Sequence, residues 1–224
     1  MKKILLCFLI LLMAPLASMA YDFEVDGIYY KLTGNSSVAV TYKVTPTGSS
    51  DYTAPYSDHI TIPSTVNYNN RFYAVTSIDY EAFKHCSGLT SVTIPESVTS
   101  IGEDAFRGCS GLTSINIPKG VTSIGIGTFS WCSALKSITI PEGVTSIGND
   151  AFSGSGLTSI NIPKGVTSIG DGAFSWCSGL TSIDIPEGVT SIGVGAFENS
   201  SSLTSITIPK SVTSIGDFVF CECI

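Results

Sequence analysis

The sequence predicts an α/β solenoid with about seven turns of 22–23 residues, short parallel strands and a β-structured N-terminal cap. Three observations support this fold class. The segment GLTSINIPKGVTSIG occupies residues 111–125 and recurs unchanged at 156–170. Seven prolines each follow an isoleucine, at intervals of 32, 23, 23, 22, 23 and 23 residues. The apolar positions between these prolines repeat from one interval to the next, so each interval predicts one turn of a stacked array.

Residues 1–20 are predicted to be a signal peptide. Lys2 and Lys3 precede an apolar run, Ile4 to Leu12, and Ser18-Met19-Ala20 offers small residues for cleavage. The run is shorter than the roughly 20 apolar residues that a membrane-spanning helix needs, and no later segment qualifies. We therefore expect a chain that is exported from about Tyr21 and is secreted, displayed on the cell surface or periplasmic, without a transmembrane segment.

Residues 21–59 are predicted to form the N-terminal β cap. Asp26-Gly27 lies between two aromatic-rich runs, which is the sequence pattern of a tight β-hairpin. Such a hairpin would cover the first turn of the array. An insertion around Asn67–Ala74 accounts for the first interval of 32 residues.

Residues 60–224 are predicted to form the solenoid. The pattern Leu-x-x-Ile-x-Ile is typical of a short parallel strand, and the proline that follows cannot donate to a strand ladder. A glycine suits the next turn, and Asp104-Ala105-Phe106 predicts a short helical turn. We thus expect one narrow strand per turn and one internal row of phenylalanines.

The residue after each proline alternates in charge along the array. Because neighbouring strands lie about 4.8 Å apart, each acidic residue would lie between two basic ones, and a slip by one turn would bring like charges together. The row comprises Glu96, Lys119, Glu142, Lys164, Glu187 and Lys210.

Units such as LTSINIPKGVTSIGIGTFSWCS resemble the BspA-like leucine-rich repeats, over about residues 60–224. The preceding FEVDGIYYKL is similar to the segment often found before such repeats. The resemblance implies an exported or surface-displayed protein, several members being associated with adhesion to host proteins. One departure is that the last unit stops at Phe220–Ile224 without a polar cap. This predicts an incomplete last unit and favours self-association of the protein through that end.

Two sets of residues are candidate binding sites. The outward strand face carries small polar residues, among them Asn116, Thr139, Asn161 and Asp184. In leucine-rich repeats the equivalent surface carries the ligand, but this face lacks the Trp, Tyr and Arg typical of binding hot spots, so a plain solvated sheet is the alternative.

Trp131 and Trp176 are the second candidate set. They occupy the same position two turns apart, about 10 Å from each other, in a column that also holds Asn199 and Glu222. Exposed indoles could stack on sugar rings or seat a partner's side chain. The alternative is that each indole fills the space left by a neighbouring glycine.

The cysteines allow two interpretations. Six follow the signal peptide, and four recur behind the phenylalanine of a unit, where Ser200 takes the place in the sixth unit and the fourth unit is expected to lack it. That pattern favours a slot for small buried side chains with free thiols. Neighbouring turns are also close enough for disulfides, and Cys221 with Cys223 is the pair best placed to be oxidised.

The sequence offers little for catalysis. Removing Lys2 and Lys3 leaves 9 basic against 18 acidic residues, a net charge of −9, which disfavours nucleic acid and anionic lipid as partners. His59 and His85 belong to no recognisable catalytic or metal-binding set, and we expect no cofactor, no metal and no enzymatic activity. The hypothesis is a recognition or adhesion protein that binds a protein or glycan, such as a host extracellular-matrix protein. The alternative is a structural or periplasmic scaffold that assembles through its open C-terminal end.

Overall fold

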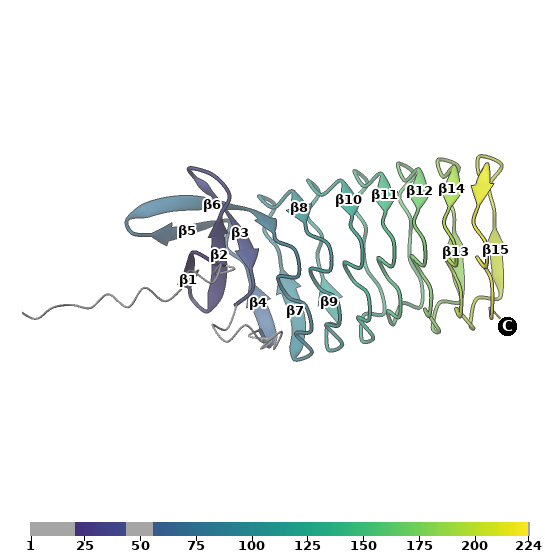
Figure 1. Ribbon diagram of the computed structural model, residues 1–224, viewed down its shortest axis with the longest axis horizontal. Coiled ribbons are helices and arrows are strands. Elements are labelled where there is room, and N and C mark those ends of the chain that lie inside the picture. The colour runs from purple at the N-terminus through teal and green to yellow at the C-terminus, as the bar shows by residue number, and fades with distance from the viewer. Residues whose placement is uncertain (1–20, 44–55, 224) are drawn as a thin grey trace, which may run out of the picture.

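The computed structural model describes residues 21–43 and 56–223, so the predicted signal peptide lies outside the described residues. A row of coils extends from a β-sheet cap at the N-terminal end (Figure 1). The described elements are strands joined by turns, with no helix among them. The coils comprise residues 58–86, 89–109, 112–132, 135–155, 157–177, 180–200 and 203–223, which we number 1 to 7. This arrangement confirms the predicted solenoid of short parallel strands.

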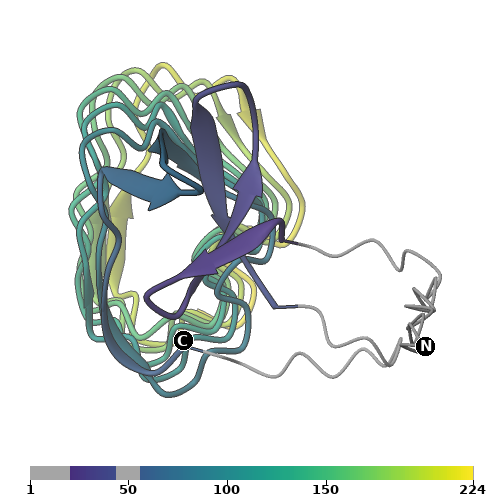
Figure 2. The same ribbon diagram turned by 90° about the vertical axis from the view of Figure 1, so that its left-hand side faces the viewer.

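The cap is one curled sheet with the strand order β1-β2-β3-β6-β5. Asp26 and Gly27, at φ 50° and 77°, form the two-residue turn between β1 and β2 and confirm the predicted hairpin. The ring of Phe23 stacks on that of Tyr68 at 4.2 Å, which brings the two outer strands of the sheet together. The cap lies across the N-terminal end of the coils (Figure 2). Its strands are β1 (Phe23–Val25), β2 (Ile28–Leu32), β3 (Ser37–Thr41), β5 (Thr65–Tyr68) and β6 (Arg71–Ile78).

Cap and solenoid share strands at their junction. β4 (Asp58–Thr61) pairs in parallel with β7 (Leu89–Thr93) and so begins coil 1. The insertion at 67–74 forms the turn and part of the hairpin β5–β6, which returns to the cap sheet before β6 pairs with β8 (Ser100–Ile101) of coil 2. The domain boundary between residues 59 and 60 stays a prediction, because the cap sheet takes strands from both sides of it.

The Leu-x-x-Ile-x-Ile segments form the first ladder, along the lower half of Figure 1. β9 (Ser114–Ile115) continues β4 and β7, and β13 (Ser182–Asp184) pairs with β15 (Ser205–Thr207), all in parallel. Bridges join Thr139 to Asn161 and Asn161 to Asp184 between these two groups. The leucine and isoleucine side chains point inward because alternate residues of a strand face opposite sides.

A second ladder, which the sequence analysis did not predict, runs along the upper half of Figure 1. Each of its strands is only a Ser-Ile pair, too short to show the alternation that identifies a strand. In coils 4 to 7 the threonine before the pair donates both its backbone N–H and its hydroxyl to the carbonyl of the equivalent threonine one coil earlier, as Thr190 does to Thr167. β8 pairs with β6 but not with β10, and the strands beyond it form a separate five-stranded parallel sheet. These strands are β10 (Ser123–Ile124), β11 (Ser146–Ile147), β12 (Ser168–Ile169), β14 (Ser191–Ile192) and β16 (Ser214–Ile215).

The third side consists of turns, so the helical turn expected at Asp104-Ala105-Phe106 is wrong. Asp104 and Gly108 have φ angles of 54° and 72°, whereas a helix needs consecutive right-handed residues. The N–H groups of Asp104, Phe106 and Gly108 donate to carbonyls of coil 3, at distances of 2.8, 3.0 and 2.8 Å. The left-handed positions therefore direct backbone donors to the next coil.

The phenylalanines form one internal spine, which confirms the stacking of equivalent residues. Their rings are parallel within 12°, and neighbouring centroids lie 5.0, 5.5, 5.6, 5.4, 5.5 and 5.8 Å apart. Tyr56 continues the spine toward the cap, 4.7 Å from the first ring. The spine comprises Phe83, Phe106, Phe129, Phe152, Phe174, Phe197 and Phe220.

The small-residue slot lies three positions after each phenylalanine of the spine and corrects one part of the sequence analysis. Coil 4 does not lack the slot, because Ser155 occupies it and is buried. The missing residue of that unit lies between Ser155 and Leu157. Cys223 holds the slot of coil 7, and its thiol donates to the carbonyl of Phe197. Cys221 and Cys223 are both free in the structure, as are the four buried cysteines.

Candidate functional site

Trp131 and Trp176 lie at the corner between the third side and the first ladder, in coils 3 and 5. Their backbones are left-handed, at φ 59° and 58°, because their N–H groups donate across to the carbonyls of Ser153 and Glu198 at 2.7 Å. The side chains are half exposed, at 51% and 54%. The fold therefore fixes two large apolar side chains in solvent at the same corner.

The surroundings of Trp131 agree in part with both interpretations from the sequence, an exposed indole and an indole that fills the space left by a neighbouring glycine. A Cβ added at Gly154 would lie 2.7 Å from Cε3 of Trp131, so the indole covers this glycine in the following coil. Half of Trp131 nevertheless stays exposed. Coil 6 carries Asn199 at this position, so Trp176 has no glycine after it. The same corner holds His85 against Gly108 in coils 1 and 2.

The four polar candidates of the strand face lie in one column of the first ladder. Thr139, Asn161 and Asp184 are exposed and joined by backbone bridges. Asn116 is placed differently, because its amide accepts from the N–H of Ile94 at 3.1 Å and donates to the carbonyl of Ile94 at 3.0 Å. Asn116 thus joins coils 2 and 3, a role that its spacing did not reveal.

Two hollows lie along this column, next to the row of residues that alternate in charge after each proline. The larger, about 520 Å³, lies between coils 3 and 4. Its lining combines Asn116 and Thr139 with three isoleucines and a rim of Glu96, Lys119 and Glu142. The smaller, about 270 Å³, is lined by Asn161 and Asp184 of coils 5 and 6 together with Lys164 and two prolines. The structure therefore brings the four polar candidates to two adjoining hollows, apart from the Trp131 and Trp176 corner.

The two histidines form no catalytic set with the described residues. His59 uses both ring nitrogens locally, with Nδ1 2.6 Å from the hydroxyl of Ser91 and Nε2 2.9 Å from that of Thr61. His85 lies against Gly108 in the turn corner. Among residues 21–43 and 56–223, no three His, Cys, Asp or Glu side chains are grouped to hold a metal ion. No helix in the described part of the chain is long and apolar enough to cross a bilayer.

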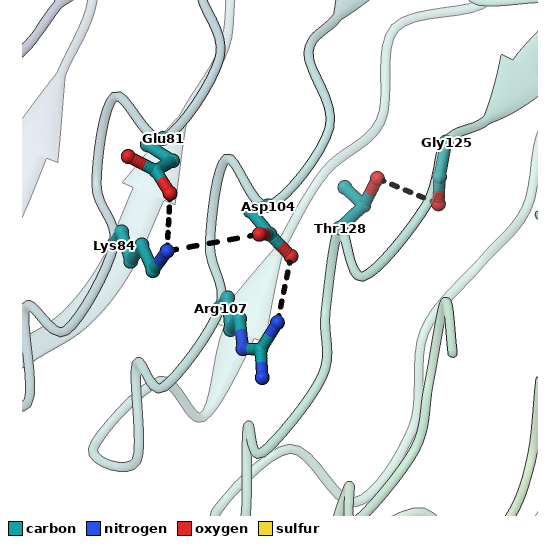
Figure 3. Close-up of polar contacts among 6 residues, drawn as sticks. All are labelled: Glu81, Lys84, Asp104, Arg107, Gly125 and Thr128. Atoms are coloured by element: carbon teal, nitrogen blue, oxygen red, sulfur yellow. Dashed lines mark hydrogen bonds and ion pairs between the residues drawn. The ribbon is translucent and has the colours of Figure 1, made fainter. Parts of the chain in front are cut away.

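A charged cluster on the third side, missed by the sequence analysis, joins coils 1 and 2 (Figure 3). Lys84 contacts Glu81 within its own coil and reaches Asp104 of the next coil at 3.7 Å. Asp104 also pairs with Arg107 at 3.4 Å. The Glu81 side chain is only 5% exposed, so these ion pairs neutralise a buried carboxylate. We interpret the cluster as a link between coils.

The buried thiols are unreactive at neutral pH. Burial raises the pKa of Cys86 and Cys177 to about 11 and that of Cys132 to about 12. Burial also raises the pKa of Cys109. Nucleophilic attack and metal binding need the thiolate, which such values suppress. The slot therefore offers packing and a hydrogen-bond donor rather than chemistry.

Comparison with protein families matches the BspA type leucine rich repeat region, in six copies, over residues 58–180 and 108–224. No curated protein matches the sequence.

Three solved structures share the fold. A leucine-rich repeat protein of Bacteroides ovatus is 35% identical with a TM-score of 0.73, and the match covers 90% of this chain and 57% of that one. A leucine rich cell surface protein of Faecalibacterium prausnitzii is 34% identical with a TM-score of 0.74, covering 90% and 52%. A leucine-rich repeat protein of T. pallidum is 30% identical with a TM-score of 0.76, covering 90% and 89%. The chain thus spans little more than half the length of the first two.

Proposed function

The chain belongs to the BspA-type leucine-rich repeat family, and we propose that it is an exported, non-catalytic recognition protein. Its repeat surface would bind a protein or glycan, with adhesion to a host extracellular-matrix protein as the specific hypothesis. The description of the F. prausnitzii relative as a cell surface protein supports this proposal for a chain with a predicted signal peptide.

The observation that carries the proposal is the pair of exposed indoles at left-handed positions. A non-glycine residue in this conformation costs on the order of 1–2 kcal/mol, and Gly108 and Gly154 avoid that cost at the same corner. Exposing about half of a tryptophan adds an unfavourable contact with water. Two such residues at the same corner, in coils 3 and 5, are expected where a partner covers the indoles, since Trp is one of the residue types enriched at binding hot spots.

The chain itself supplies the variants that test this proposal. Trp131→Gly and Trp176→Gly introduce the residue that coils 2 and 4 already carry at this position, so the backbone conformation is kept. We expect the purified protein to bind one member of a panel of extracellular-matrix proteins or of a glycan array. The double variant should bind that ligand at least about tenfold more weakly, because hot-spot residues contribute about 2 kcal/mol or more each.

The control removes exposed apolar side chains elsewhere on the third side. Ile126→Thr and Val194→Thr change side chains that are 45% and 48% exposed and should leave binding within about twofold of the unmodified protein. Equal losses of binding affinity in the glycine pair and the threonine pair would overturn the role of the indoles. Unchanged affinity after the glycine substitutions would overturn it as well.

A second candidate function, a scaffold that assembles through its C-terminal coil, is supported by the exposure of that coil. Ile215, Phe218 and Phe220 are 51%, 68% and 40% exposed, whereas Ile192 and Phe197 of coil 6 are 2% and 0% exposed. The cap covers the opposite end of the solenoid (Figure 2). A contact between coil 7 of one copy and coil 7 of a second copy would therefore give a dimer that adds no further copies.

Sedimentation measures this self-association directly. We expect a monomer–dimer equilibrium over about 1–500 μM, shifted toward monomer by Phe218→Ser and Ile215→Ser, which remove the apolar surface. A strict monomer at the highest concentration would exclude the scaffold.

A further inference from the structure

The two tryptophans belong to a regular series at the corner between the third side and the first ladder. His85, Trp131 and Trp176 occupy this position in coils 1, 3 and 5. Gly108 and Gly154 occupy it in coils 2 and 4. A ring therefore alternates with a glycine over five successive coils. At about 4.8 Å per coil, equivalent atoms of the two tryptophans lie about 10 Å apart along the corner.

The indole of Trp131 lies with one face against Gly154. A Cβ added at Gly154 would lie 2.7, 2.8 and 3.1 Å from Cε3, Cδ2 and Cζ3 of Trp131. Three bonded ring atoms are nearly equidistant only from a point above the face of the ring, because a point beyond its edge is much nearer to one of them. Since this face is covered while half of the side chain is exposed, the opposite face meets solvent.

The surroundings of the two indoles are uncharged. In coils 3 to 5, no residue within two positions of this corner along the chain is acidic or basic. Ser133 and Ser178 follow the two tryptophans by two residues, and both serines are exposed. A serine hydroxyl donates and accepts hydrogen bonds without adding charge. The corner thus combines flat apolar ring faces with neutral hydroxyl groups.

We propose that this corner binds an uncharged, extended β-1,4-linked hexose polysaccharide that runs along the solenoid axis. The apolar faces of its sugar rings stack on the exposed faces of Trp131 and Trp176, and its hydroxyl groups bond Ser133 and Ser178. This inference rests on the proposed recognition function and names the ligand class for the same corner.

The regular spacing of the rings favours a polysaccharide over a protein partner. Successive units of a β-1,4-linked chain are turned over, so every second unit presents the same face, which matches one indole in every second coil. A folded protein surface has no such repeat. The excess of acidic over basic residues disfavours an acidic polysaccharide, and the neutral corner offers such a chain no cation.

Tryptophan fluorescence reports directly on this corner, because Trp131 and Trp176 are the only tryptophans in the sequence. The probes are the β-1,4-linked cellohexaose and mannohexaose, their disaccharides, and the α-1,4-linked maltohexaose. We expect a β-1,4-linked hexasaccharide to shift the emission to shorter wavelength, because stacking removes the indoles from water. It should bind at least about tenfold more tightly than its disaccharide, since only the longer chain reaches both indoles. No shift with either β-1,4-linked hexasaccharide, or equal binding of maltohexaose, would overturn the proposal.

Matched variants place the binding on the indoles. Trp131→Gly, followed through the remaining indole, should lower the hexasaccharide affinity to about that of the disaccharide, because one ring is left. Gly154→Asn keeps both indoles, and Asn199 shows that asparagine adopts this backbone conformation, at φ 58°. Its Cβ would displace the ring of Trp131 and should weaken binding at least about fivefold.

Ile126→Thr, which changes an exposed apolar side chain elsewhere on the third side, is the control and should change the affinity less than about twofold. Hexasaccharide affinity that survives both Trp131→Gly and Gly154→Asn would overturn the assignment to this corner.

The panel of matrix proteins separates this inference from the proposed function. Hexasaccharide binding that is lost with the indoles supports both. A matrix protein that binds through the indoles, while no hexasaccharide binds, would overturn the polysaccharide and leave the recognition function standing. If neither a matrix protein nor a glycan binds, both fail.

Discussion

In coils 2, 3, 5, 6 and 7 the small residue behind the spine phenylalanine donates a hydrogen bond to the preceding coil. Cys109 donates its thiol to the carbonyl of Phe83 at 3.0 Å, and Ser200 donates its hydroxyl to that of Phe174 at 2.7 Å. Both side chains are fully buried. Cysteine and serine exchange at this slot because each is small and each carries one donor, which adds a hydrogen bond between coils to a carbonyl such as that of Phe83, which also accepts from the N–H of Cys86 at 3.1 Å.

We expect this burial to make the protein sensitive to alkali. The unfolded chain releases thiol protons near pH 9, whereas folded Cys86, Cys132 and Cys177 hold theirs to about pH 11, 12 and 11. The folded state binds more protons above pH 9, so the free energy of unfolding falls as pH rises, by about 1.4 kcal/mol per thiol and pH unit.

Urea unfolding at pH 8 and pH 10 measures the effect. Replacing the three thiols by serine, as at Ser155 and Ser200, should reduce the loss of stability between these pH values by about 1 kcal/mol per thiol. Tyrosines and lysines titrate equally in both proteins, so parallel losses would contradict the assignment.

At the scale of the element, each coil is joined to a neighbouring coil by backbone hydrogen bonds on two or three of its sides. The first ladder, the second ladder and the turn side all carry backbone hydrogen bonds between coils, and the phenylalanine spine fills the space that they enclose. A coil alone would leave these backbone groups and its apolar residues in water, which is why the repeat is stable only as an array.

The spine predicts a graded response to cavity formation. Phe129→Ala removes a fully buried ring between two stacked neighbours and should lower the free energy of unfolding by about 3–5 kcal/mol. Phe220→Ala, at the 40% exposed end of the spine, should cost less than half as much. Urea denaturation followed by circular dichroism measures both, and equal costs would show that coil 7 is as well packed as coil 3.

At the scale of the whole molecule, the two ends of the solenoid differ. At the N-terminal end, β6 belongs to both the cap sheet and the second ladder, so coil 1 is covered on its outer side. At the other end, β15 and β16 each have one strand edge without a partner among the described residues. Stability is therefore expected to decrease toward coil 7.

Amide hydrogen exchange measures this gradient. The amides of β16 should exchange at least about tenfold faster than those of β11, because opening coil 7 breaks contacts with one neighbour and opening coil 4 with two. Equal protection at dilute concentration would mean that another surface covers coil 7, and its loss on further dilution would identify a second copy.

Much of the fold follows from residue spacing, whereas the site depends on details that spacing does not contain. The proline intervals predicted the stacking, and the spine from Phe83 to Phe220 confirms it. The second ladder was missed because a Ser-Ile pair is too short for alternation. The helical turn was wrong because Asp104 and its equivalents adopt a left-handed conformation to reach the next coil, a choice that only the neighbouring coil dictates. The missing strand pairs between β8 and β10 and between β9 and coil 4 were equally hidden in the sequence.

By itself the sequence determined that equivalent side chains lie in columns, because a repeat of constant length that cannot fold alone must stack in register. It thereby determined which residues share a corner, including Trp131 and Trp176. Only the tertiary structure decided which side chains of a column form hydrogen bonds between coils and which border a hollow. Asn116, bonded to Ile94, and Thr139, beside a hollow, illustrate the difference. The physical reason is that bonding between coils depends on how closely neighbouring coils approach each other, which the spacing of residues along the chain does not contain.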